Sequence, residues 1–112
     1  MKTAFVFPGQ GSQKVGMAHA MVASYPWAAE MAAHTDAVLG RKLTEACFVG
    51  PEETLKLTIN TQPAIFFASA LMVEAARRDG VAFDAVAGHS LGEYAALYAA
   101  GVAGYDDLLR LV

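Results

Sequence analysis

The chain has 112 residues, of which 55% are hydrophobic and 17% are charged, and its net charge is -3 at pH 7. This length and composition fit one packed domain and exclude intrinsic disorder. The acidic balance lacks the basic footprint that nucleic-acid binding requires, so we expect no nucleic-acid partner.

The sequence offers no metal or disulfide chemistry. Cys47 is the only cysteine, and no cluster of Cys and His residues has the spacing of metal ligands. We expect Cys47 to be a small buried hydrophobe rather than a nucleophile. Residues 1–7 are too short for a signal peptide, and no 18-residue run is apolar enough to span a bilayer. We therefore expect a soluble cytoplasmic protein that needs no metal or cofactor and no membrane partner.

The first part of the chain predicts a strand, a glycine-rich loop and two helices. Residues 3–7 form a short apolar run, typical of a strand that is buried on both faces. Two glycines in the loop at residues 8–13 indicate a close backbone approach or a positive φ, but the loop matches neither phosphate-binding glycine motif. Helical spacing then predicts helices over residues 16–24 and 26–39, the second ended by Gly40.

The middle of the chain is expected to be mostly helical. Residues 43–48 predict a turn or short helix, and a second short helix starts at Pro51. The longest helical pattern opens at residues 61–63 and runs to about Asp79, with Pro63 in its first turn. Because this pattern has little polar surface, we expect the helix to lie deep against a sheet.

Residues 83–100 carry the most informative pattern. An apolar run at residues 83–87 predicts a strand, residues 91–100 predict a helix, and residues 88–92 (GHSLG) match G-x-S-x-G between them. Three fixed positions match by chance in roughly 3 to 4% of chains this long, so the flanking strand and helix give the motif its weight. In this geometry the serine is strained and exposed, and the first N–H groups of the helix can stabilise an oxyanion. The sequence predicts acyl-transfer chemistry at Ser90.

Two strands separated by mostly helical chain predict an α/β fold with a parallel sheet and flanking helices. Apolar parallel strands need neighbours at their edges and helices over both faces. We therefore expect an α/β-hydrolase-like acyltransferase core that is incomplete here, with residues 1–112 as the N-terminal part of a single acyltransferase domain. A last helical segment is expected over residues 108–112, capped by Asp106 or Asp107.

Three stretches, in this order, resemble the malonyl-CoA:acyl carrier protein transacylases of fatty-acid synthesis. They are residues 5–13 (FVFPGQGSQ), residues 61–64 (TQPA) and residues 88–94 (GHSLGEY). The resemblance covers nearly the whole chain, which corresponds to about the first third of such an enzyme. It implies an enzyme that moves a malonyl group from coenzyme A to the phosphopantetheine thiol of acyl carrier protein through an acyl-serine intermediate. Its partners would be malonyl-CoA and acyl carrier protein, and the oligomeric state stays open.

The resemblance also assigns roles to residues. It makes Ser90 the nucleophile and builds the oxyanion hole from the backbone N–H groups of Gln10 and Leu91. It places Gln62 at the wall of the substrate pocket. His89 is expected beside this pocket, with its imidazole facing away from the Ser90 hydroxyl because neighbouring residues at a strand end point to opposite sides.

Two parts of the family's machinery have no position in this sequence. The resemblance places the histidine base far downstream and the arginine that pairs with the malonyl carboxylate just beyond Val112. A serine without a neighbouring base is a poor nucleophile, so the chain as printed is expected not to turn over. Arg110 is expected to be an ordinary helix residue.

Three other readings remain open. An acyltransferase domain of a polyketide synthase would share all three motifs and accept a different extender unit. An esterase of the α/β-hydrolase type would pass the acyl group to water. A non-catalytic fragment would dock a partner or a complementing second half of the domain.

Overall fold

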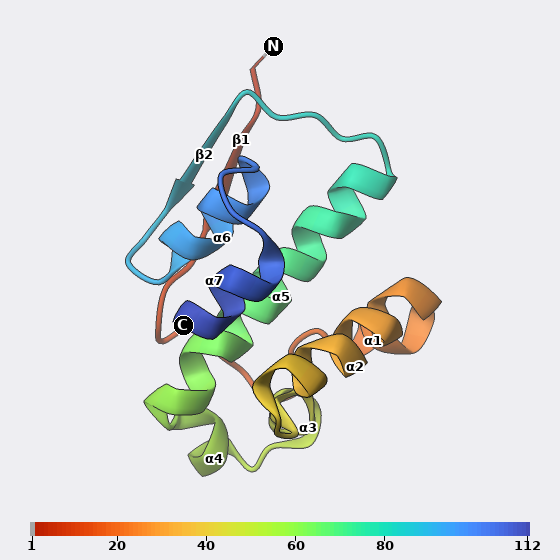
Figure 1. The fold of residues 1–112 in the computed structure, drawn as a ribbon, viewed down its shortest axis with the longest axis vertical. Helices are drawn as coiled ribbons and strands as arrows, with labels where there is room; N and C mark the ends of the chain where they lie inside the picture. Colours follow the sequence, from red (N-terminus) through yellow and green to blue (C-terminus); the bar gives the residue numbers. More distant parts are fainter. Residues whose placement is uncertain (1) are drawn as a thin grey trace.

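The computed structural model describes residues 2–112, in which a two-stranded parallel sheet lies at one margin of a mostly helical molecule (Figure 1). The strands β1 (Ala4–Phe7) and β2 (Ala85–Gly88) pair with Ala4 opposite Ala85 and Phe7 opposite Gly88. This confirms the predicted α/β arrangement. The helices, in chain order, are α1 (His19–Ser24), α2 (Pro26–Leu39), α3 (Leu43–Val49), α4 (Glu52–Lys56), α5 (Thr58–Arg78), α6 (Gly92–Ala99) and α7 (Tyr105–Leu111).

Helix α5 begins earlier than the sequence pattern predicts. Its first residue is Thr58, so Pro63 lies inside the helix and not in its first turn. A proline inside a helix lacks the N–H that would bond to the carbonyl four residues earlier, here that of Ile59. Arg41 supplies a replacement donor, because its Nη2 lies 2.6 Å from the Ile59 carbonyl oxygen and its Nη1 donates to the Asn60 side chain. The bound guanidinium stabilises an N-terminal turn of α5 that the proline would otherwise weaken.

We predict that Arg41→Met destabilises the protein by about 1–3 kcal/mol, because the Ile59 carbonyl and the buried amide of Asn60 lose their charged donor. Chemical denaturation followed by circular dichroism measures this change. The matched control is Lys42→Met, which removes an exposed cation next in sequence and should change stability by less than about 0.5 kcal/mol. Equal effects of the two substitutions would show that the bonds to α5 contribute nothing.

Two other helix starts differ from the sequence predictions. Helix α1 begins at His19 rather than at residue 16, because Ala18 takes a left-handed conformation with φ 65° that interrupts the helix. Helix α7 begins at Tyr105 after Gly104, and Asp106 and Asp107 lie within its first turn and do not cap it. In that first turn the two carboxylates interact favourably with the positive end of the helix dipole.

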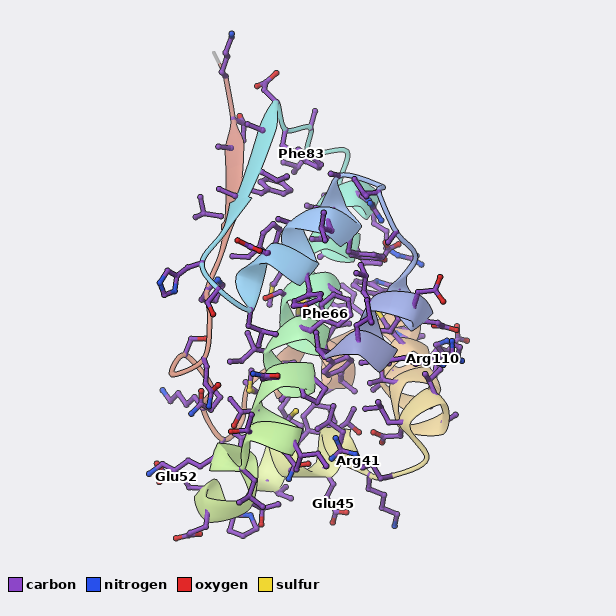
Figure 2. The ribbon with its side chains drawn as sticks, turned by 60° about the vertical axis from the view of Figure 1, so that its left-hand side comes forward. Arg41, Glu45, Glu52, Phe66, Phe83 and Arg110 are labelled. Atoms are coloured by element: carbon purple, nitrogen blue, oxygen red, sulfur yellow. The ribbon has the colours of Figure 1, made fainter. Side chains whose placement is uncertain are left out.

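Helix α5 packs chiefly against other helices, where we expected a sheet. One side of it joins Phe66 to Phe7 of β1 and to apolar residues of α6 and α7. The other side joins Phe67 and Leu71 to a second core cluster with α2, α3 and α4. Figure 2 shows Phe66 in the interior, between α5 and the helices α6 and α7. The helix thus connects the layer that carries the sheet to the layer formed by α1 to α4.

Helix α6 is tied to α5 at its last turn. Arg77 Nη2 lies 3.2 Å from the carbonyl oxygen of Tyr98 and 3.3 Å from that of Ala99. The Tyr98 hydroxyl donates to Glu74 Oε2 at 3.2 Å, and burial, followed by the charge of Glu74, raises the pKa of Tyr98. These contacts hold α6 against α5 while its other end meets the strands. In the described part of the chain, no helix has the length and apolar character needed to cross a membrane.

Candidate active site

The site lies where both strands end. Because β1 and β2 run in parallel, the segments that follow them leave the same edge of the sheet. The N–H of His89 donates to the Phe7 carbonyl oxygen at 3.1 Å, so the two chain segments stay together one residue past the strands. This edge therefore brings the loop at residues 8–13 next to the turn at residues 88–92.

Ser90 occupies a left-handed backbone conformation with φ 54°. Such a conformation is strained for a residue with a Cβ, and it reverses the chain between β2 and α6. Two tight-turn bonds complete the reversal, from Gly92 N–H to the His89 carbonyl and from Glu93 N–H to the Ser90 carbonyl, each 3.0 Å long. Ser90 is exposed at the crest of this turn, as the G-x-S-x-G motif predicts.

Two glycines allow the turn to pack against the strands. A Cβ on Gly88 would collide with the carbonyl group of Gly92, and a Cβ on Gly92 would collide with the carbonyl group of Phe7. The start of α6 therefore rests directly on the ends of both strands, backbone against backbone. This contact fixes the position of Ser90 between the two glycines.

We predict that Gly92→Ala destabilises the protein by about 1–3 kcal/mol, because the added methyl group must displace the backbone at the end of β1. The denaturant midpoint reports the change. Gly104→Ala is the control, since an added Cβ there meets no atom within 4 Å and φ is -78°. Gly104→Ala should change the free energy of unfolding by less than about 1 kcal/mol. Alanine restricts the unfolded chain, which stabilises the protein, but it is a poorer N-cap for α7 than glycine, which offsets that gain. If the two variants behaved alike, close packing at Gly92 would not matter.

Substitutions at Ser90 should reveal how much the left-handed backbone conformation lowers the free energy of unfolding. We predict that Ser90→Gly is more stable than Ser90→Ala by about 1 kcal/mol, because glycine adopts a positive φ without a Cβ clash. Thermal and chemical unfolding of both variants measures the difference. Equal stability of the pair would contradict a strained turn at this residue.

The loop at residues 8–13 lies against the turn through Gly9. A Cβ on Gly9 would come within 2.5 Å of the His89 carbonyl oxygen and 3.2 Å of its Nδ1 atom. The loop is braced by Ser12 Oγ, which donates to the Gly9 carbonyl at 2.8 Å, and by the Gly11 N–H, which donates to Gln13 Oε1 at 2.7 Å. The sequence predicts a close backbone approach in this loop but does not show that Gly9 is the glycine that touches the serine turn.

The two amides expected to form the oxyanion hole have no hydrogen-bond acceptor within residues 2–112. Gln10 directly follows Gly9, which touches His89, and Leu91 directly follows Ser90. Each amide thus follows the end of one strand, and their convergence on one oxyanion stays a prediction.

The remaining predicted site residues lie on three different elements. Gln62 is half-buried on α5, one helical turn before Phe66, whose ring joins the same core cluster as Phe7. His89 is exposed, and its side chain makes no hydrogen bond to any described residue. Glu93 lies in the first turn of α6, as expected. No hydrogen bond joins Gln62 to Ser90 within residues 2–112, and the place of Gln62 in a pocket stays a prediction.

Alternative nucleophiles and bases lie elsewhere. Burial raises the pKa of the Cys47 thiol from 9.0 to about 12, and the nearby charge of Asp36 adds to this shift, which makes the thiol unreactive near neutral pH. His34 Nε2 lies 2.7 Å from Asp106 Oδ1, and the His19 ring packs on Phe48. Within residues 2–112, no three His, Cys, Asp or Glu side chains are grouped to hold a metal ion. Arg110 lies on the outer side of α7, 3.9 Å from Asp107 (Figure 2).

The strand, the strained serine turn and the helix form a nucleophile-elbow arrangement, and comparison with known proteins identifies the family that carries it. Residues 4–112 match the model of the acyl transferase domain, and the chain belongs to this family. A malonyl CoA-acyl carrier protein transacylase from Synechocystis is 48% identical over 112 residues, which are 100% of this chain and 38% of that protein. Its crystal structure matches 99% of this chain and 37% of its own with a TM-score of 0.93. The resemblance to the malonyl-CoA:acyl carrier protein transacylases is confirmed.

Two further comparisons show the range of pathways around this fold. A polyketide biosynthesis protein, ThaF from Burkholderia thailandensis, is 46% identical over 110 residues, which are 97% of this chain and 9% of that protein. A malonyl-transacylase solved in complex with a polyketide acyl-carrier protein is 41% identical, with a TM-score of 0.93 over 99% of this chain and 36% of its own. The chain thus spans little more than a third of the transacylases it matches.

Proposed function

We propose that this chain is the nucleophile-bearing, N-terminal part of a single acyltransferase domain that moves a malonyl group from coenzyme A to acyl carrier protein. The observation that carries the proposal is the exposed Ser90, held at φ 54° in the turn between β2 and α6. The 48% identity to a malonyl transacylase over the whole chain supports the choice of substrate class.

The reaction would proceed in two balanced steps. In the first, Ser90 Oγ bonds to the thioester carbonyl carbon of malonyl-CoA, the carbon–sulfur bond breaks, and coenzyme A leaves as the thiol. In the second, the phosphopantetheine thiol of acyl carrier protein attacks the serine ester, and the Ser90 hydroxyl is restored. Both tetrahedral intermediates place negative charge on the former carbonyl oxygen, where the N–H groups of Gln10 and Leu91 would stabilise it.

Other residues take supporting parts in this proposal. Gln62 on α5 and His89 beside Gly9 would line the pocket that receives the malonyl group. The proton of the Ser90 hydroxyl needs a base; His34 contacts Asp106 and His19 packs on Phe48, and the family resemblance places the base downstream of this chain. We therefore assign the base, and the cation that binds the malonyl carboxylate, to the part of the domain outside this chain.

Transfer of the acyl group through Ser90 is tested in a chimera in which residues 1–112 replace the matching segment of the Synechocystis transacylase. We predict that incubation with malonyl-CoA adds one malonyl group to the chimera and that peptide mapping locates it on Ser90. The Ser90→Ala chimera should stay unlabelled, because the ester has no oxygen on which to form. The measurement is intact-protein and peptide mass spectrometry.

Glu93→Gln is the matched control, since this residue lies in the same turn of α6 and is assigned no chemical role. It should keep the label. A label that persists in the Ser90→Ala chimera would overturn the assignment of the nucleophile, and release of free malonate without transfer to carrier protein would favour an esterase.

Transfer within a polyketide pathway is the second candidate, and the 46% identity to ThaF is the observation that favours it. The two candidates share the chemistry of Ser90 and differ in the acyl group and the carrier. Competition between malonyl-CoA and methylmalonyl-CoA, with fatty-acid and polyketide carrier proteins as acceptors, separates them in the same chimera.

A further inference from the structure

Two hydrogen bonds meet on the carbonyl oxygen of Gly9, in the loop that follows β1. Ser12 Oγ donates to this oxygen at 2.8 Å, and the Ser12 N–H donates to it at 3.3 Å. The backbone bond closes a four-residue turn, whose third residue, Gly11, has φ 108°. The hydroxyl of Ser12 thus adds a second bond to a turn that the backbone already closes.

The Gly9 carbonyl belongs to the same peptide group as the N–H of Gln10. A peptide group is planar, and in its trans form the C=O and the N–H point in opposite directions. Holding the Gly9 oxygen therefore sets the direction of the Gln10 N–H, which is one of the two donors expected in the oxyanion hole. A hydrogen bond accepted by the C=O also polarises the peptide group and makes its N–H a stronger donor.

The peptide group on the other side of Gln10 is held as well. Its N–H, which belongs to Gly11, donates to Gln13 Oε1 at 2.7 Å. Both peptide groups that flank the Gln10 Cα are therefore bonded to side chains of the same loop. Gln10 is exposed, whereas Gly9 is buried against His89. The loop thus keeps the backbone of an exposed residue in one orientation.

The second expected donor is held by the backbone alone. The N–H of Leu91 shares a peptide group with the Ser90 carbonyl, which accepts the Glu93 N–H at 3.0 Å. The start of α6 supplies this bond, so no side chain is needed there. No helix follows β1 directly, because residues 8–18 separate it from α1. In that loop the hydroxyl of Ser12 takes the part that the helix backbone plays after β2.

We infer that Ser12 is a positioning residue for acyl transfer, whose hydroxyl orients and polarises the Gly9–Gln10 peptide group so that its N–H donates to the oxyanion formed at Ser90. The inference rests on the proposed function, because it takes the Gln10 N–H to be an oxyanion donor. Ser12 acts through the Gly9 carbonyl and not on the substrate. Loss of its hydroxyl should therefore slow the chemical step and leave the binding of malonyl-CoA unchanged.

Single-turnover malonylation of the chimera tests this inference. Ser12→Ala should lower the rate constant at saturating malonyl-CoA by about 10-fold to 100-fold, because the donor is misplaced but not removed. The half-saturating concentration of malonyl-CoA should change by less than about twofold. Ser12→Thr keeps a hydroxyl at this exposed position and should restore the rate to within about threefold of the unsubstituted chimera.

The matched control is Ser24→Ala, the same substitution at an exposed serine that ends α1, and it should leave the rate unchanged. A double substitution separates positioning from general support of the loop. The Gln10→Pro chimera has no N–H at residue 10, so adding Ser12→Ala to it should lower the rate by less than about twofold further.

Equal rates for Ser12→Ala and the unsubstituted chimera would overturn the inference and keep the proposed function. A full further loss of rate in the Gln10→Pro background would also overturn it, as would a raised half-saturating concentration at an unchanged rate, because Ser12 would then act on the substrate. Unfolding of Ser12→Ala in circular dichroism would assign the hydroxyl to the fold and reject the inference. An unsubstituted chimera that takes up no malonyl group would reject the proposed function and the inference together.

Discussion

The left-handed backbone of Ser90 is the constraint on which the rest of the site depends. A residue with a Cβ holds φ 54° only where its surroundings fix both neighbouring segments. Here Gly88 and Gly92 let α6 rest on the strand ends, and Arg77 ties the far end of α6 to α5. The exposed hydroxyl at the turn is a direct consequence of this packing, and without it the chain would reverse in a wider loop.

The turn at Ser90 is predictable from the sequence because the constraints on it are local. A glycine, a serine and a second glycine between a strand and a helix specify the turn by themselves, and the proline at residue 26 and the glycine at residue 40 bound α2 as expected. The start of α5 was predicted too late, because the hydrogen-bond partner of the Ile59 carbonyl is Arg41, on a distant segment. The contact between Gly9 and His89 was hidden for the same reason, since it depends on how the two strands pair.

The two sides of β1 illustrate how one short strand serves two purposes. Phe7 packs into the core with Phe66 and its carbonyl accepts the His89 N–H, which positions the loop that carries Gln10. The other edge of β1 is unpaired among the described residues, and Val6 is 75% exposed. The apolar sequence of β1 thus predicts burial on both sides of the strand, and residues 2–112 bury only one of them.

The central claim is that backbone N–H groups from the two strand ends converge on one oxyanion, and removing one N–H tests it most directly. Gln10→Pro deletes the amide hydrogen while Gln10→Ala keeps it, so the rate of Ser90 malonylation in the chimera should fall by about 100-fold to 1,000-fold for proline alone. Circular dichroism confirms that both variants fold. Equal rates for the proline and alanine variants would contradict the account, because the loop after β1 would then contribute no donor to the reaction.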